Sequence, residues 1–196
     1  MHHDYDLLSQ IKADLPAGRQ DSLEVLLVKY EKRIYTTAYR YFNNAADAAD
    51  AAQESALKIC RNIMGVTILA DNPDGLAPWI STITIRTCLD VLRYRKRRPE
   101  QLYDHEDPAQ EAAFNMPMAP SAENIALHRD RNATIASCIA CLPDESKAII
   151  IMRDMQGLSY QELSEAMGIP VNTIKSRLHR ARAHLRKLLT EQGVTP

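Results

Sequence analysis

The chain has 196 residues with a formal net charge of −1, and 45% of its residues are hydrophobic. This length allows one domain of ordinary size or two small domains joined by a linker. The longest apolar run, residues 148–152, is far shorter than a membrane span, and the N-terminus lacks the basic and apolar segments of a signal peptide. We therefore expect a cytoplasmic protein without membrane insertion.

The small net charge hides charged segments of opposite sign. Residues 86–98 contain six basic side chains and one acidic side chain, and residues 172–190 contain six basic side chains and no acidic one. Residues 100–126, in contrast, contain six acidic side chains and neither lysine nor arginine. This sorting indicates more than one kind of partner, and the two basic segments are typical of contacts with nucleic acid.

Glycine is scarce and the apolar residues recur at helical spacing, which predicts a nearly all-α protein. The first marked helix carries an apolar series from Leu23 to Tyr41 and ends at Asn43–Asn44. A second helix is predicted over about residues 46–64. Its predicted inner face consists of Ala49, Ala52, Ala56, Ile59 and Ile63.

A third helix is predicted to start near Pro78, after turn-forming residues 70–75, and to continue through the first basic segment until Pro99. The acidic residues that follow have too little apolar content to form a core, so we expect a flexible linker. The predicted organisation is an N-terminal domain over residues 1–99, an acidic linker over 100–120 and a C-terminal domain over 121–196.

A helix-turn-helix is predicted near the C-terminus. Ser159 and Glu162 are spaced as a capping box, Gly168 suits the left-handed residue that ends a helix, and Pro170 suits the first turn of the next helix. In that next helix the apolar residues form one stripe at Ile174, Leu178, Ala181, Leu185 and Leu188. Two helices joined by a tight glycine turn allow the second helix to enter a DNA major groove.

The side of this helix that faces away from the stripe is polar and basic, with donors for base edges and phosphates. We expect DNA contacts from Asn172, Thr173, Lys175, Ser176, Arg177, His179 and Arg180. Arg177 lies nearer the stripe, so an internal ion pair is an equally good interpretation for it. The alternative for the whole face is a solvated basic helix that packs against a protein.

Several motifs resemble extracytoplasmic-function (ECF) sigma factors of bacterial RNA polymerase. Leu142–Pro143 and residues 157–182 resemble region 4 of that family, most specifically in Thr-Ile-Lys-Ser-Arg-Leu-His-Arg-Ala-Arg at 173–182. Residues 47–54 resemble region 2.2, and Trp79–Ile80 with residues 90–93 resemble regions 2.3 and 2.4. The resemblance covers almost the whole chain and implies two small helical domains, region 2 and region 4.

The resemblance implies partners for particular residues. Core RNA polymerase would bind an acidic face of the second helix through its β′ clamp helices, at Asp47, Asp50, Gln53, Glu54 and Leu57. The minus-ten element of the promoter would contact Trp79, Arg86, Arg93, Arg95, Lys96 and Arg97. The helix-turn-helix would read the minus-thirty-five element beside the β flap, and an anti-sigma factor is a further implied partner.

Each of these assignments has an alternative. The acidic face is also explained as a solvated surface, and Trp79 is equally well explained as a core residue or as a wedge at the melted base pairs. Arg86 and Ile85 depart from the family, which often has Asn and Arg there, so the minus-ten preference is expected to differ. The linker is interpreted equally well as a mimic of RNA in the exit channel or as a solvated tether.

Other chemistry is not indicated. Cys138 and Cys141 have the spacing of a zinc or redox pair, but no second pair or histidine cluster completes a site, so we expect both to be reduced core thiols and expect no metal or cofactor. No nucleotide fingerprint or catalytic arrangement is recognisable, so an enzyme is not expected. The competing interpretations are a dimeric helix-turn-helix regulator and an inhibitory adaptor that docks on polymerase without reading DNA.

Overall fold

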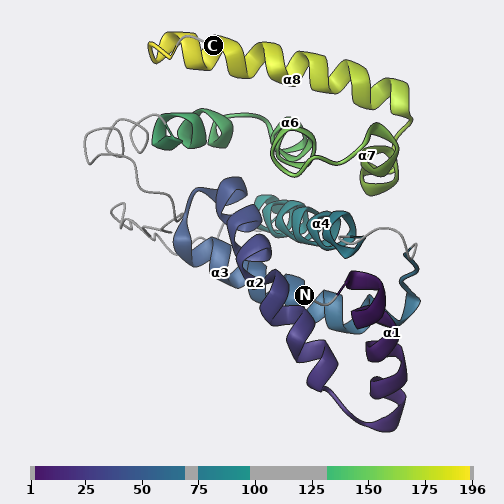
Figure 1. Cartoon of the computed structure of the whole chain (residues 1–196). Coiled ribbons are helices and arrows are strands. Elements are labelled where there is room, and N and C mark those ends of the chain that lie inside the picture. The colour runs from purple at the N-terminus through teal and green to yellow at the C-terminus, as the bar shows by residue number, and fades with distance from the viewer. Residues whose placement is uncertain (1–2, 69–74, 98–131, 195–196) are drawn as a thin grey trace, which may run out of the picture.

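The computed structural model describes residues 3–68, 75–97 and 132–194, and within these ranges every regular element is helical. The acidic segment predicted as a linker over residues 100–120 lies outside the described residues, as does the expected start of the C-terminal domain at residue 121. We call residues 3–68 with 75–97 the N-terminal module and residues 132–194 the C-terminal module. Figure 1 shows the C-terminal module stacked on the N-terminal one, with α8 and α1 at opposite ends.

The N-terminal module is a bundle of four helices with two short 3₁₀ turns. In chain order these elements are α1 (Asp4–Asp14), η1 (Leu15–Ala17), α2 (Asp21–Phe42), α3 (Ala45–Asn62), η2 (Ile63–Gly65) and α4 (Leu76–Arg97). The predicted break after the α2 series is confirmed, because Asn43 adopts a left-handed conformation with φ 53°. The side chain of Asn44 then caps α3 by accepting a hydrogen bond from the Asp47 amide at 3.0 Å.

The inner face of α3 differs from the predicted alanine stripe. The residues that α3 buries are Ala48, Ala51, Ser55 and Ile59, whereas Ala49 is exposed and Ala56 is half-buried. The reason is Ser55, whose hydroxyl donates to the Ala51 carbonyl at 2.6 Å and therefore needs no water. The prediction used only apolar residues and so left out this serine, and the predicted alanines therefore lie one position after the residues that are buried.

The C-terminal module contains helical residues 132–140 and four further elements. These are α6 (Asp144–Ile150), its continuation as a π turn η4 (Ile151–Met155), α7 (Tyr160–Met167) and α8 (Val171–Glu191). The predicted capping box is confirmed: the Ser159 hydroxyl accepts from the Glu162 amide at 3.2 Å, and the Glu162 carboxylate accepts from the Ser159 amide at 2.7 Å. Gly168 ends α7 with φ 67°, as predicted.

Pro170 differs slightly from its predicted place. It precedes α8 as its N-cap residue, and the first helical residue is Val171. The extended backbone of Pro170, with ψ 147°, directs the chain from α7 into α8. Its carbonyl accepts from the Ile174 amide at 3.0 Å, so the proline still begins the hydrogen-bond ladder of the helix.

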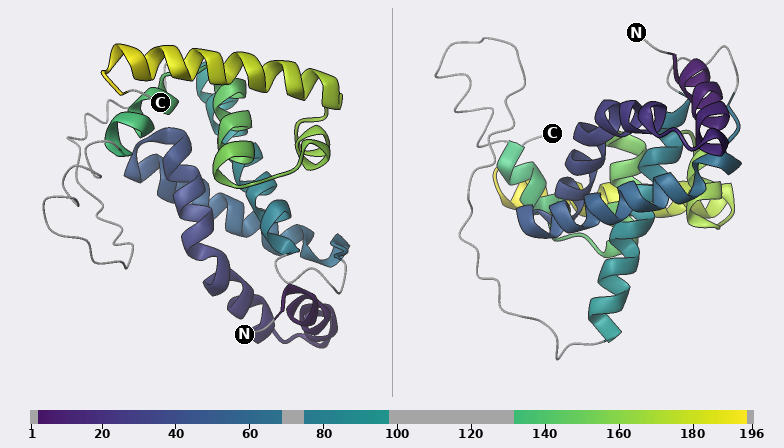
Figure 2. Two further views of the ribbon diagram at one scale, coloured as in Figure 1. Left: turned by 45° about the horizontal axis from the view of Figure 1, so that its top comes forward. Right: turned by 90° about the horizontal axis from the view of Figure 1, so that it is seen from below.

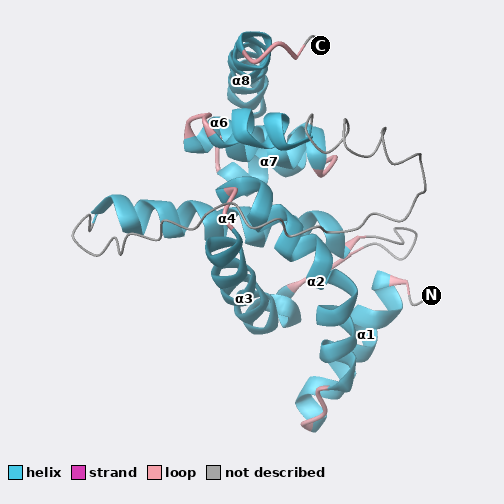
Figure 3. Ribbon diagram, turned by 90° about the vertical axis from the view of Figure 1, so that its left-hand side faces the viewer, coloured by secondary structure: helices cyan, strands magenta, loops and turns pink. Residues whose placement is uncertain are grey.

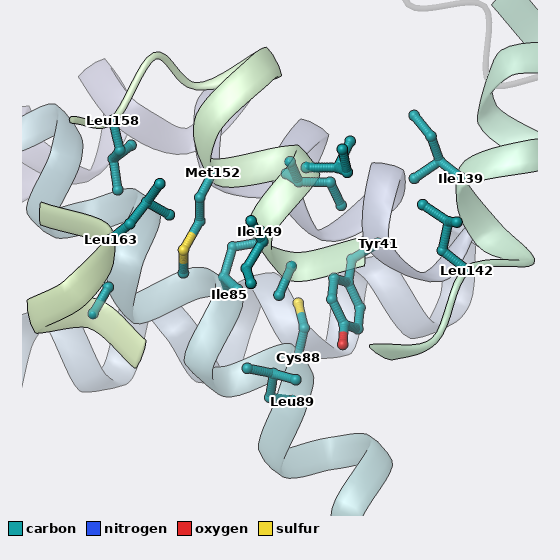
Figure 4. Packing of buried hydrophobic residues seen from close by; sticks show 14 of the residues in the cluster. Tyr41, Ile85, Cys88, Leu89, Ile139, Leu142, Ile149, Met152, Leu158 and Leu163 are labelled. Atoms are coloured by element: carbon teal, nitrogen blue, oxygen red, sulfur yellow. The ribbon is translucent and has the colours of Figure 1, made fainter. Parts of the chain in front are cut away.

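The two modules share one hydrophobic core, an interface that no sequence pattern indicated. Figure 4 shows Tyr41 of α2 and Ile85, Cys88 and Leu89 of α4 packed with apolar side chains of the C-terminal module, among them Ile149 of α6. All of these side chains are buried. A second core lies wholly within the N-terminal module, between α1, α2, α3 and the start of α4. The view at right angles confirms that α6 and α7 lie between α4 and α8 (Figure 3).

A buried carboxylate joins the first helix to two others. Asp4, at the start of α1, is completely buried and accepts hydrogen bonds from the Lys29 ammonium at 2.7 Å and the Tyr30 hydroxyl at 2.5 Å, both on α2. It also accepts from the Leu76 amide at 2.8 Å, and Leu76 is the first residue of α4. One side chain therefore holds the beginning of α4, because the first amides of a helix have no partner within it.

We predict that Asp4→Ala lowers the free energy of unfolding by about 2–4 kcal/mol, because three donors lose their shared acceptor and the Leu76 amide is left buried without one. Urea denaturation followed by circular dichroism measures this loss. Asp6→Ala is the matched control, since Asp6 lies in the same turn but is exposed, and it should change stability by about 0.5 kcal/mol or less. Equal effects of the two substitutions would contradict this role of Asp4.

Candidate nucleic-acid interface

The outward face of α8 is the predicted DNA-reading surface of the C-terminal module. Its apolar stripe packs inward, with Ile174, Leu178 and Ala181 buried and Leu185 and Leu188 half-buried. The opposite face exposes five of the predicted residues: Asn172, Lys175, Ser176, His179 and Arg180. Thr173 is half-buried, and its carbonyl accepts from the Ser176 hydroxyl at 3.0 Å. The exposed donors lie near the amino end of α8, the part of a recognition helix that contacts base edges.

Two ion pairs attach α8 to the helices beneath it. Arg177, predicted as a DNA contact or an internal ion pair, forms a salt bridge with Glu145 of α6. Arg182 forms a two-pronged salt bridge with Asp154 of η4, with one bond of 3.0 Å. These pairs fix the orientation of α8, so the structure favours the internal role for Arg177.

Tyr160 holds Lys175 at the junction of α7 and α8, a contact that sequence reasoning missed. The Lys175 ammonium lies 5.6 Å from the centre of the Tyr160 ring, and the Arg153 guanidinium lies 4.7 Å from it. Such cation–π contacts restrict a lysine that is otherwise free to move. A shallow hollow beside them is lined by Tyr160, Lys175, His179, Arg182 and Arg186.

The cations of the basic segment of α4 differ in whether they contact the C-terminal module. Arg93 and Arg97 are exposed, and the last turns of α4 extend beyond the rest of the described molecule in the right-hand view of Figure 2. Lys96 forms a salt bridge with Asp144 at the start of α6. Arg86 donates to backbone carbonyls of α7. Two of the six predicted minus-ten residues thus contact the C-terminal module.

Arg95 and Asp47 were predicted to serve different partners, and the structure joins them. The Arg95 guanidinium donates to both carboxylate oxygens of Asp47, one of them at 2.9 Å. These hydrogen bonds raise the pKa of Arg95 above its ordinary value. The pair ties the amino end of α3 to the last turns of α4, so neither charge is fully available to a partner.

A mainly apolar groove of about 680 Å³ runs between α2 and α3, beside the predicted acidic face. Its lining includes Val28 and Tyr35 of α2 and Ala52, Gln53 and Ala56 of α3. Sequence reasoning found the α3 side, where Asp50 and Gln53 are exposed, Glu54 is half-buried and Leu57 is 46% exposed. It missed the α2 side, where Val28 is 68% exposed. The sequence feature that could have indicated the α2 side of the groove is a pair of valines, Val25 and Val28, which do not belong to the apolar series that α2 buries.

Trp79 lies at the edge of the core of the N-terminal module. Its side chain is half-buried and packs against the core of the N-terminal module. It also lines a hollow between the modules together with Arg86 of α4 and Glu165 of α7. The structure thus supports the core interpretation, and a role of Trp79 as a wedge at the melted base pairs stays a prediction.

The cysteines differ from the expectation that both members of the pair are buried. Cys138 is buried, but Cys141 is exposed because it follows the end of helical residues 132–140. All four cysteines are free thiols. Within the described ranges, no three His, Cys, Asp or Glu side chains are grouped so that they could hold a metal ion. None of the helices described here is both long enough and apolar enough to cross a membrane.

Two family models match the chain, and together they cover both modules. Residues 26–98 match Sigma-70 region 2, and residues 133–185 match Sigma-70, region 4. Among solved structures, the fold is similar to the sigma factor RpoE of Bartonella quintana, determined with the anti-sigma factor NepR, with a TM-score of 0.63 and 19% identity over 87% of this chain and 98% of that one. It is also similar to CnrH, determined with the cytosolic domain of CnrY, with a TM-score of 0.61 and 20% identity over 96% of this chain and 97% of that one.

Curated relatives agree with the family models. The ECF RNA polymerase sigma factor SigE of Mycolicibacterium smegmatis is 31% identical over 88% of this chain, which spans 63% of the length of that relative. The ECF RNA polymerase sigma factor SigW of Bacillus subtilis is 30% identical over 89% of this chain and 92% of its own length. The chain therefore belongs to the ECF sigma factors of the sigma-70 superfamily.

Proposed function

We propose that this chain binds core RNA polymerase in the cytoplasm, directs it to promoters with minus-thirty-five and minus-ten elements, and promotes melting of the DNA. The observation that carries the proposal is the presence in one chain of two different surfaces, a basic helix-turn-helix face and an apolar groove bordered by acidic residues. A regulator that reads DNA alone needs only the first. The proposal assigns no catalytic step and no cofactor to the chain itself.

In this proposal the α2–α3 groove receives the β′ clamp helices of polymerase. An apolar centre with a polar rim is the usual anatomy of a protein–protein interface. Val28 and Leu57 supply exposed apolar surface on α2 and α3, and Asp50 with Glu54 supplies the rim. Asp47 takes part less directly, through its pair with Arg95.

The exposed face of α8 reads the minus-thirty-five element, with Lys175 and Arg180 as its main cations, while the C-terminal module contacts the β flap. The last turns of α4 neutralise phosphates near the minus-ten element through Arg93 and Arg97. Family membership adds an anti-sigma factor as a further partner. The role of the acidic segment over 100–120 stays a prediction.

We predict that the double substitution Lys175→Ala with Arg180→Ala lowers promoter-specific run-off transcription by about 10- to 100-fold while leaving the affinity for core polymerase unchanged, because two exposed donors to DNA are lost. The promoter is chosen by mapping transcript starts after overexpression of the chain. Lys187→Ala removes a cation from the other end of α8 and is the matched control. Normal transcription by the double variant would contradict the assignment of α8.

We predict that Val28→Asp weakens binding to core polymerase at least about tenfold, because a carboxylate would be desolvated in an apolar groove. Binding is measured by titrating labelled chain with core enzyme.

Tyr5→Asp is the control for Val28→Asp, since Tyr5 is 41% exposed on α1 and lies outside the residues that line the groove. Equal affinities of the two variants would remove the groove from the proposal. Absence of any binding by the unmodified chain would contradict the proposed function itself.

A further inference from the structure

The C-terminal module occupies part of the α4 surface that was expected to meet promoter DNA. Arg86 donates from Nε to the Ala166 carbonyl at 2.8 Å and from Nη2 to the Glu165 carbonyl at 2.9 Å. Both carbonyls belong to the last turn of α7, where helix carbonyls lack partners and the helix dipole is negative. Arg86 thus acts as a cap for a helix of the other module.

A second polar connection centres on Gln156, directly after the π turn. Its side-chain amide donates to the Thr37 hydroxyl of α2 at 2.7 Å, and its side-chain oxygen accepts from the Ser81 hydroxyl of α4 at 3.1 Å. Thr37 and Ser81 are both buried, and each hydroxyl also has a hydrogen bond to Arg33 of α2 in its own module: Thr37 donates to the Arg33 carbonyl at 2.7 Å, and Ser81 accepts from Arg33 Nε at 3.0 Å. One glutamine therefore binds two helices of the N-terminal module at once.

Apolar contacts surround these polar ones. Ile85 lies one residue before Arg86 and is completely buried in the shared core, with Cys88 and Leu89 on the same side of α4 (Figure 4). Ile85 and Arg86 are also positions at which the sequence departs from residues that the family often has. Both are used to hold the modules together.

With the two modules packed together, which we call the closed arrangement, the chain is shorter than the distance between the two promoter elements. The names of the two promoter elements place them about 25 base pairs apart, or roughly 80 Å along the duplex. A compact chain of this length has a diameter of only about 40 Å. The two DNA-reading surfaces therefore meet their elements together only after the modules separate.

We propose that the closed arrangement is a latent state, in which Arg86 and Gln156 fasten the two modules and delay engagement of polymerase and promoter. This inference rests on the proposed function, because latency is defined by the binding that it delays. A partner that binds only the open chain has an apparent affinity reduced by the small open fraction. Removing the contacts that Arg86 or Gln156 makes between the modules should therefore raise the affinity for core polymerase.

Cys88 reports closure directly in the full-length chain. It is completely buried in the shared core, and burial raises the pKa of its thiol to about 12, so it reacts slowly with N-ethylmaleimide while the modules are joined. Cys138 is buried within the C-terminal module and Cys141 is exposed, and they give internal slow and fast references. Peptide mass spectrometry separates the three rates.

Gln156→Ala should raise the labelling rate of Cys88 at least about fivefold without raising that of Cys138, because two hydrogen bonds between the modules are lost. Arg86→Ala should act in the same direction. Gln161→Ala is the matched control, since Gln161 is exposed and its side chain donates to Glu165 within α7. Labelling of Cys88 as fast as Cys141 in the unmodified chain would show that the modules are already apart and would overturn the proposal.

The second measurement is affinity for core polymerase. Gln156→Ala should bind about fivefold or more tightly than the Gln161→Ala control, in parallel with its faster Cys88 labelling. Faster labelling with unchanged affinity would overturn latency while leaving the proposed function intact. Failure of every variant to bind would instead overturn the proposed function, and Cys88 labelling would still report whether the chain is closed.

Discussion

The described structure depends on a hydrophobic core to which both modules contribute. Tyr41, Ile85 and Leu89 from the N-terminal module and Ile149 and Leu163 from the C-terminal module are buried in the same cluster. Modules of this size have a high ratio of surface to volume and gain stability from any apolar area covered by a neighbour. The shared core explains why α6 and α7 lie directly on α4 even though the chain between α4 and the C-terminal module is long.

The same packing determines which charges remain available. Lys96, Arg86 and Arg177 all have partners within the chain, and each of these contacts joins elements that are distant in sequence. Lys175 and Arg180 stay exposed on α8, although the Lys175 ammonium lies over the Tyr160 ring of α7 and Arg180 lines a hollow with residues of α4 and α6. Lys147 is the opposite case: its ammonium is nearly buried above the Tyr41 ring at 5.2 Å, and burial lowers its pKa.

Features set by neighbouring residues were predictable from the sequence. The stop at Asn43, the capping box at Ser159 and the left-handed Gly168 all depend on the residue itself and a few neighbours, and each was located correctly. The all-helical class and the stripe of α8 followed from periodicity. The family, and with it the choice of site residues, followed from motifs that a general argument from charge could not have specified.

The remaining features depend on contacts between distant segments. The Asp47–Arg95 pair, the carbonyl contacts of Arg86 and the α2 side of the groove join residues that no local pattern relates. Cys141 is exposed because a helix ends at residue 140, and a sequence pattern predicts the last residue of a helix only to within one or two positions. The displaced face of α3 shows that a serine with a local hydrogen bond is as easily buried as an alanine.

Because of the π turn η4, the direction of the Gln156 side chain depends on the number of residues between α6 and α7. Gln156 donates its amide to the Ile151 carbonyl at 3.0 Å, five residues earlier, so the turn accommodates one residue more than a regular helix. Loss of one residue here would restore α-helical winding and rotate the following side chains by about 100°. Gln156 would then point away from Thr37 and Ser81. We therefore expect related chains that keep this interface to vary in sequence between residues 151 and 155 but to conserve the number of residues.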